Sequence, residues 1–183
     1  VYRHEFSDSD YIEKTIIING GSYSFVSGYN YNLENTFPSN ADVRFLWDSG
    51  IYPTERGEND IRESHSSAYL FQNGSLESIT QSTEIGVDEE FFNNKINWVA
   101  IRNKYFSVIM VPDVVSDYAS LSSKNISFAD RSVTPIYSAA LGYRGASGNI
   151  ALTLFLGPLD IDHISVLGED VDSIMNFGWS IIQ

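Results

Sequence analysis

The chain has 183 residues, of which 43% are hydrophobic and 14% aromatic, a composition that excludes a disordered chain and fits one domain with a filled core. Acidic residues number 24 against 11 basic ones, and the net charge of −13 repels phosphate backbones, so we expect no nucleic-acid partner. The absence of cysteine excludes disulfides and Cys-ligated metals, and no apolar run reaches the ~20 residues that cross a bilayer.

The first part of the chain is a series of short strands. Runs rich in β-branched and aromatic residues predict strands at 1–6, 11–19, 23–26, 43–47, 68–71 and 76–79. Asn73-Gly74 between the last two is typical of a type I′ hairpin turn. Residues 30–40 and 56–67 are polar, so we expect a loop in each place.

A hairpin is predicted in the middle of a sheet at residues 98–112. Two apolar runs, 98–101 and 105–111, flank Arg102-Asn103-Lys104, and Asn103 suits the turn. Pro112 ends the second run because it has no N–H to donate to a strand ladder. The acidic group Asp88-Glu89-Glu90 that precedes the hairpin lacks the spaced ligands of a calcium loop, so we interpret it as solvated.

Further strands are predicted at 126–128, 133–140 and 150–156. The serine-rich residues 113–125 are expected to be at least partly loop, and residues 142–149 a glycine-rich connection. Strands of this length with frequent turns and little helical periodicity indicate an all-β sandwich.

The pattern becomes helical near the C-terminus. Pro158 is expected in the first turn of a helix, where its missing N–H costs nothing, with Asp160 and Asp162 at the positive helix end and Gly168 as terminator. A second helical piece should present its apolar residues on one face: Val171, Ile174 and Met175.

Four segments together resemble the periplasmic domain of the YidC membrane-protein insertases. The matching residues, in chain order, are Trp47, Gly50, Ile51, Pro53, Thr54 and Glu55; Trp98-Val99-Ala100 with Lys104-Tyr105-Phe106 and the apolar run to Pro112; Phe155, Gly157 and Pro158; and Asn176-Phe177-Gly178-Trp179. Asn176 stands where Asp is commoner in that family.

The resemblance implies a fold and an organisation. The fold would be a β-supersandwich of two antiparallel sheets, similar to that of galactose mutarotases, with short C-terminal helices. We expect a single domain that lacks its first strands, with residues 1–156 as the sandwich and 157–183 as a helical hinge toward the next transmembrane span. The transmembrane helices of the family are not in this sequence.

The resemblance also implies a role at the periplasmic face of the bacterial inner membrane. The domain would aid the insertion and folding of membrane proteins through protein–protein contacts, without catalysis and without a cofactor. The expected partners are subunits of the Sec translocase and nascent membrane proteins.

Five residues of the hinge are predicted to form a membrane-proximal binding segment: Gly157, Pro158, Phe177, Gly178 and Trp179. The rings and isoleucines of residues 177–182 suit either a core or a bilayer interface, and the resemblance favours the interface. Four tyrosines could line a cleft for a peptide or sugar, although packing on the sheet is the simpler interpretation: Tyr23, Tyr29, Tyr31 and Tyr52.

The alternative function is that of a carbohydrate-binding or mutarotase-like domain. Such an enzyme needs a histidine acid and a glutamate base in one cleft, and His65 with Glu55 or Glu84 is the only combination that the sequence offers. The three histidines have no metal-ligand spacing, so we expect no metal. Fold similarity alone does not transfer an activity.

Overall fold

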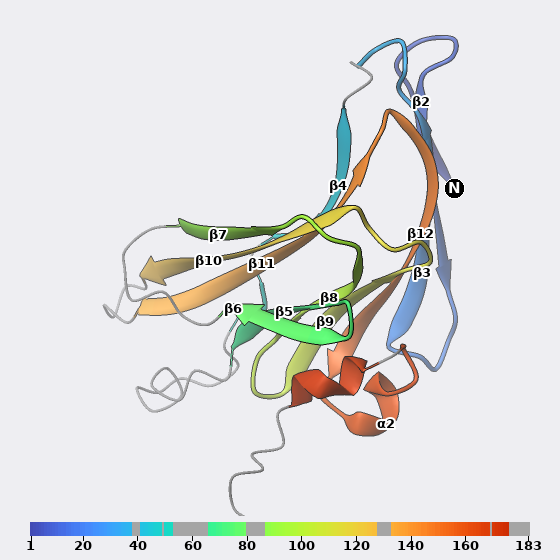
Figure 1. Cartoon of the computed structure of the whole chain (residues 1–183). Helices are drawn as coiled ribbons and strands as arrows, with labels where there is room; N and C mark the ends of the chain where they lie inside the picture. The colour runs from blue at the N-terminus through green and yellow to red at the C-terminus, as the bar shows by residue number, and fades with distance from the viewer. Residues whose placement is uncertain are drawn as a thin grey trace, which may run out of the picture.

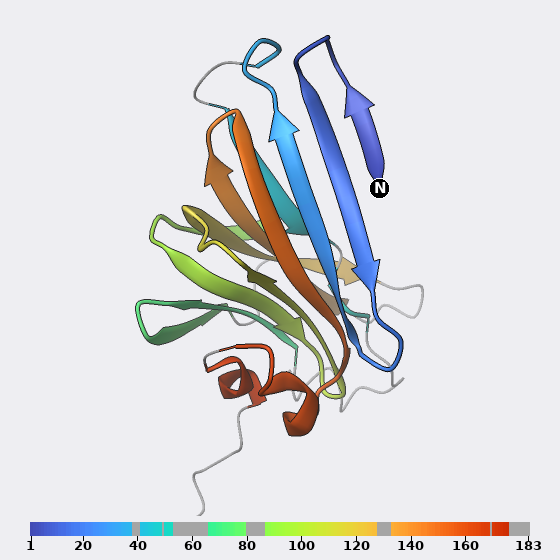
Figure 2. The same ribbon diagram turned by 90° about the vertical axis from the view of Figure 1, so that its right-hand side faces the viewer.

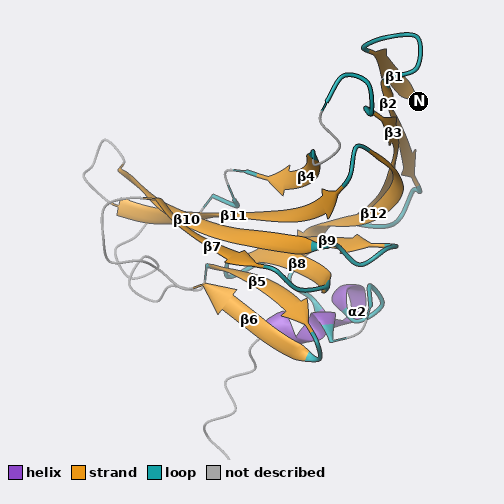
Figure 3. Ribbon diagram, turned by 45° about the horizontal axis from the view of Figure 1, so that its top comes forward, coloured by secondary structure: helices purple, strands orange, loops and turns teal. Residues whose placement is uncertain are grey.

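The computed structural model describes residues 1–37, 41–48, 50–52, 66–79, 87–127, 133–168 and 170–175. Its described strands form two antiparallel sheets, one of eight strands and one of four, with two short helical pieces near the C-terminus (Figures 1 and 3). The predicted all-β sandwich is therefore confirmed. No helix in these ranges is long and apolar enough to span a bilayer.

The larger sheet, sheet A, contains the predicted central hairpin. Its strands lie side by side in the order β1 (Tyr2–Glu5), β2 (Tyr11–Ile18), β3 (Ser24–Asn32), β12 (Ser147–Pro158), β9 (Phe106–Pro112), β8 (Ile96–Arg102), β5 (Ser67–Gln72) and β6 (Ser75–Ile79). The hairpin of β8 and β9 occupies the middle of this sheet, as predicted, and β9 ends at Pro112. Asn73 and Gly74 have φ values of 51° and 75°, which the predicted type I′ turn requires.

The smaller sheet, sheet B, packs on one face of sheet A. It has the order β4 (Asp42–Trp47), β11 (Val133–Arg144), β10 (Tyr118–Ser127) and β7 (Val87–Phe92). The main core lies between the sheets, where Val99 and Ile101 of β8 meet Leu121 of β10 and Leu141 of β11. Along the central strands, alternate residues point into this core because side chains alternate along a strand.

The opposite face of sheet A carries a second core, which the C-terminal helical pieces cover. These are α2 (Ile161–Ile164) and the 3₁₀ helix η1 (Val171–Met175), seen at one end of sheet A in Figure 2. Trp98 stacks on Phe71 in this core, with ring centroids 5.5 Å apart. Ile164, Val171 and Ile174 are fully buried against it. The helical pieces are therefore fixed to the sheet by their apolar side chains.

The prediction that Pro158 opens a helix is wrong. Pro158 is the last residue of β12 and pairs with Phe106 of β9, and a proline is tolerated there because the strand ends. The helix begins three residues later, where the Asp160 side chain accepts a 2.9 Å hydrogen bond from the Asp162 N–H and caps it. The helix ends at Ile164, before Gly168, with Ser165 as its C-cap.

Two strands cover residues for which no strand was predicted, although residues 113–117 lie outside the strands, as expected of a segment that is at least partly loop. β10 occupies much of residues 113–125, and its Ser120 and Ser123 are buried although serine has little strand propensity. β7 contains the acidic residues 88–90 at the edge of sheet B, where Arg44 pairs with Glu89 at 3.1 Å. A charged residue is tolerated on an edge strand because one side of that strand meets water.

Two predicted loops are also shorter than expected. β3 continues through Asn30 and Asn32, because the intervening Tyr31 is buried in the main core. β11 and β12 extend into the predicted connection of residues 142–149, which leaves Gly145 and Ala146 between them. Tyr118 lies over Gly142, where a Cβ atom would be 2.1 Å from the Tyr118 ring, so glycine is required inside this strand.

Candidate functional site

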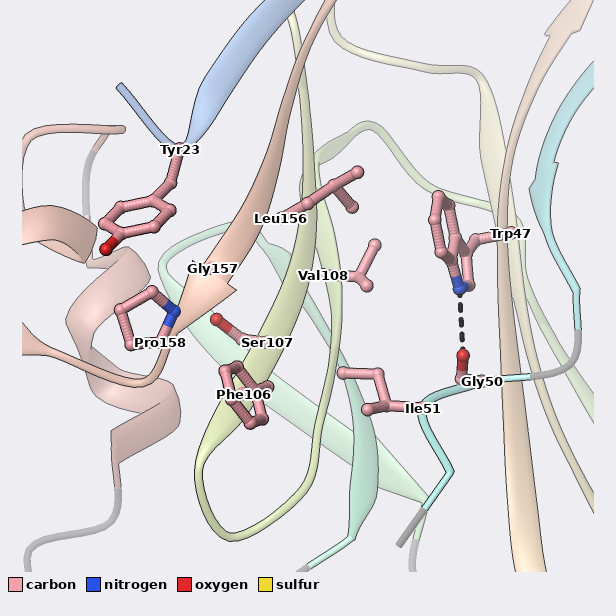
Figure 4. A pocket seen from close by; sticks show the side chains of 10 residues that line it. All are labelled: Tyr23, Trp47, Gly50, Ile51, Phe106, Ser107, Val108, Leu156, Gly157 and Pro158. Carbon is pink, nitrogen blue, oxygen red and sulfur yellow. Dashed lines mark hydrogen bonds between the residues drawn. The ribbon is translucent and has the colours of Figure 1, made fainter. Parts of the chain in front are cut away.

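An open apolar pocket of about 440 Å³ lies at the end of the sandwich where β12 stops and β9 begins. Figure 4 shows the ten residues that line it: Tyr23, Trp47, Gly50, Ile51, Phe106, Ser107, Val108, Leu156, Gly157 and Pro158. All of them except Tyr23 lie in three segments that carry the family resemblance and come from distant parts of the chain, residues 47–55, 98–112 and 155–158. We take this pocket as the candidate functional site.

Gly157 allows Tyr23 to approach the end of β12. A Cβ atom on Gly157 would lie 2.8 Å from Phe155 Cζ and 2.8 Å from Tyr23 Cβ and Cγ. The Leu156 N–H donates a 2.9 Å hydrogen bond to the Tyr23 carbonyl, which fixes this approach. Tyr23 in turn meets His163 of α2, with ring centroids 5.0 Å apart. Gly157 therefore brings the β2–β3 turn, β12 and α2 together at the pocket.

The opposite wall of the pocket is the segment that follows β4. The Trp47 indole N–H donates to the Gly50 carbonyl over 3.2 Å. Gly50 has a φ of 56°, and its Cβ would lie 2.7 Å from the Tyr137 carbonyl oxygen, so a side chain is excluded on both grounds. The turn at Gly50 places Ile51 against the pocket, as Figure 4 shows.

Asn103 joins this wall to the central hairpin. Its side-chain oxygen accepts hydrogen bonds from the N–H groups of Tyr105 at 2.9 Å and Phe106 at 2.8 Å. Its amide nitrogen donates to the Tyr52 carbonyl over 3.3 Å. Because Asn103 is buried, its amide group needs these partners, and the predicted turn residue also positions the pocket.

The predicted binding residues fall into two groups. Gly157 and Pro158 line the pocket, whereas Phe177, Gly178 and Trp179 lie outside the described residues, as do Pro53, Thr54 and Glu55 of the resemblance. The sequence did not single out Phe106, Val108 or Leu156 as pocket residues. The alternation within the predicted strands indicates which residues share a face, but the end of the sandwich at which they meet depends on the sheet pairing.

The four tyrosines that were considered for a cleft do not act together. Tyr31 is buried in the main core, and Tyr29 packs beside it against Phe45, with ring centroids 4.5 Å apart. Tyr23 lines the pocket. Tyr52 is exposed and directly follows the lining residue Ile51 in the sequence. Packing therefore explains Tyr29 and Tyr31, and of the four only Tyr23 lines the candidate site.

The lining residues suit binding through apolar contact. None of the ten carries a carboxylate, an imidazole or an amine, and their polar groups are those of Tyr23, Trp47 and Ser107. His65, Glu55 and Glu84, the residues of the carbohydrate alternative, lie outside the described residues. Within the described ranges no group of three His, Cys, Asp or Glu side chains is placed to hold a metal ion.

Comparison with known proteins identifies the family. The profile of the YidC periplasmic domain matches residues 5–183. The chain is similar to proteins named "Membrane protein insertase YidC" from Prosthecochloris aestuarii, with 29% identity over 97% of this chain and 30% of that protein, and from Chlorobaculum tepidum, with 32% identity over 92% of this chain and 28% of that protein. A third such protein, from Chloroherpeton thalassium, is 28% identical over 94% of this chain. The chain spans about 30% of the length of these relatives, and it belongs to the family of YidC periplasmic domains.

Proposed function

We propose that this periplasmic domain is a non-catalytic scaffold that helps a membrane protein insertase to insert and fold inner-membrane proteins. The relatives support this role, since each of those described above is named an insertase and none is named a carbohydrate enzyme. The lining of the candidate site supports it too, because apolar walls without a carboxylate or imidazole suit contact with another polypeptide better than acid–base chemistry.

The observation that carries the proposal is the burial of the C-terminal helical pieces on sheet A. Ile164, Val171 and Ile174 are each fully buried against the second core. The Leu159 N–H also donates a 2.7 Å hydrogen bond to the Tyr105 carbonyl, which ties the start of this segment to the central hairpin. We propose that residues 157–183 form the hinge of the domain and hold it in one orientation over the membrane part of the insertase.

The proposed partners are nascent membrane proteins and subunits of the Sec translocase. Apolar side chains are exposed on sheet B, among them Leu46 on β4 and Phe91 on β7, and we propose that they contact such chains. We propose that these contacts contribute less to insertion than the fixed orientation does.

The test uses the full-length insertase in cells depleted of the native protein. The double variant Ile164→Ala/Ile174→Ala should lower insertion at normal abundance, because it loosens the helical pieces from sheet A. The matched control is Leu46→Ser/Phe91→Ser, which changes two exposed residues and should keep insertion near the normal level. Normal insertion by the first variant, with its helical pieces shown to be detached, would contradict the proposal.

A further inference from the structure

The end of the sandwich beside α2 carries exposed aromatic side chains from three separate segments. We name Tyr23, Tyr52, Tyr105 and Phe106 the aromatic rim, and between 39% and 57% of each of these residues is exposed. Tyr23 follows the β2–β3 turn, Tyr52 follows β4, and the other two lie at the β8–β9 turn. Ile18 and Ile161 are exposed at the same end, on β2 and α2.

Contacts show that the aromatic rim is one feature. The ring of Tyr23 meets His163 on α2. The carbonyl of Tyr105 accepts the hydrogen bond from Leu159, two residues before α2, and the carbonyl of Tyr52 accepts from Asn103 in the same turn as Tyr105. Figure 2 shows the β2–β3 turn, the β8–β9 turn and α2 at the same end of sheet A.

We propose that the aromatic rim rests on the lipid bilayer, with its rings in the interfacial region of the membrane. Tyrosine gathers at membrane–water interfaces because its apolar ring enters the lipid while its hydroxyl stays hydrated, and a phenylalanine ring such as that of Phe106 adds apolar surface that can be buried among the acyl chains. The turn between β8 and β9 also contains the cationic Lys104 and no acidic residue, which fits lipid phosphates in a chain of net charge −13.

The direction of the chain supports a bilayer as the occupant. Met175, the last described residue, ends η1 at the same end as α2, and the sequence continues with Phe177, Trp179, Ile181 and Ile182. About 70% of the length of the relatives lies outside the matched region, and those relatives are named membrane protein insertases. This inference deepens the proposed function, since a rim on the membrane would help the hinge to hold one orientation.

The experiment uses the cysteine-free chain with a single introduced cysteine that carries an environment-sensitive fluorophore. Gly20→Cys labels the β2–β3 turn, where a Cβ atom meets nothing within 4 Å. Val114→Cys labels the opposite end of the sandwich, at an exposed residue after β9. An N-terminal histidine tag holds the chain on vesicles of phosphatidylcholine and phosphatidylethanolamine that contain a nickel-chelating lipid.

The label at Gly20→Cys should shift its emission to the blue and be quenched by spin-labelled lipid, while the label at Val114→Cys should do neither. Tyr105→Ser/Phe106→Ser should abolish the shift, and Phe37→Ser/Val115→Ser, a pair of exposed residues elsewhere, should preserve it. If the rim variant unfolds, the inference is still tested by comparing the lipid quenching of the Gly20→Cys and Val114→Cys labels in chains that keep the native rim residues.

No response at Gly20→Cys, or an equal response from both labels, would overturn the inference. The vesicles contain no translocase and no substrate, so failure here leaves the insertion test of the proposed function unaffected. Conversely, loss of insertion on loosening the helical pieces says nothing about contact between the rim and lipid.

Discussion

The indole nitrogen of Trp47 donates a 3.2 Å hydrogen bond to the carbonyl oxygen of Gly50. This bond holds Gly50 close to the last residue of β4, and the next residue, Ile51, lines the pocket. It joins two residues of the Trp47–Glu55 motif, so at this point the motif specifies the turn that builds one wall of the candidate site. Gly50 is needed in the turn because its φ of 56° is unfavourable for other residues.

Gly50→Ala should therefore destabilise the domain by about 1–3 kcal/mol, from left-handed strain and the close approach to the Tyr137 carbonyl. Urea unfolding measures this change. Gly20→Ala is the matched control, since a Cβ there meets nothing within 4 Å, and it should leave the midpoint nearly unchanged. Equal stabilities for the two variants would show that the turn at Gly50 is not constrained as described.

Gly157→Ala should displace Tyr23 and destabilise the end of β12, at a cost of about 1–3 kcal/mol for an overpacked contact. The displacement is measurable by NMR as a change in the Tyr23 ring resonances. Gly28→Ala on the neighbouring strand β3 is the control, because its nearest contact would be an ordinary 3.9 Å from Thr15. Unchanged Tyr23 resonances in Gly157→Ala would contradict the proposed packing.

Ile174→Ala should detach η1 from sheet A while the sandwich stays folded. Removing a fully buried isoleucine side chain down to Cβ costs about 2–5 kcal/mol. Hydrogen exchange should show faster exchange of amides in residues 170–175 and unchanged exchange in β8. Asp172→Ala, at an exposed position of the same helical piece, should have little effect. Faster exchange throughout β8 would instead mean that the second core and the sandwich unfold together.

Asp10 should make the stability of the N-terminal part depend on pH. Burial raises the pKa of its carboxyl, but hydrogen bonds from Thr36 and Asn35 outweigh burial and hold the pKa below its ordinary value. Because the folded pKa is lowered, this stabilisation is present above the ordinary value of 3.8 and is lost as the pH falls through the folded pKa.

Asp10→Asn should consequently lower the melting temperature at neutral pH, and the difference from the native chain should shrink as the pH falls below 3.8. Thermal unfolding followed by circular dichroism at several pH values gives this difference. Asp8→Asn, on the same turn but exposed, should leave the curve unchanged. A difference that grows at low pH would mean that the Asp10 carboxylate opposes folding.

The sequence predicted the elements whose local pattern agrees with their environment. The β8–β9 hairpin is an example, because its apolar runs are buried and Asn103 is a suitable turn residue. Only the end of β10 fell within a predicted strand, since Ser120 and Ser123 are buried by neighbouring strands that the local sequence does not reveal. Pro158 was misplaced for a similar reason, as its pairing with Phe106 depends on distant residues.

The pocket itself was not predicted from the sequence. Gly157 and Pro158 were identified from the resemblance and do line the pocket, but their neighbours Trp47, Ile51 and Phe106 meet them only in the folded sheet. A local pattern shows that a glycine is unusual in a strand such as β12. It does not show that Tyr23 occupies the space that the missing side chain leaves.

The most direct test of the account is an insertion assay in proteoliposomes with full-length insertase that carries a short Gly/Ser linker after Met175. The linker leaves the buried contacts of Ile164 and Ile174 intact but frees the domain from the chain that follows. We predict that insertion falls sharply, while the same linker placed between Asn73 and Gly74, in the exposed β5–β6 turn, leaves insertion unchanged. Full insertion with the linker after Met175 would contradict the claim that a fixed orientation of this domain supports insertion.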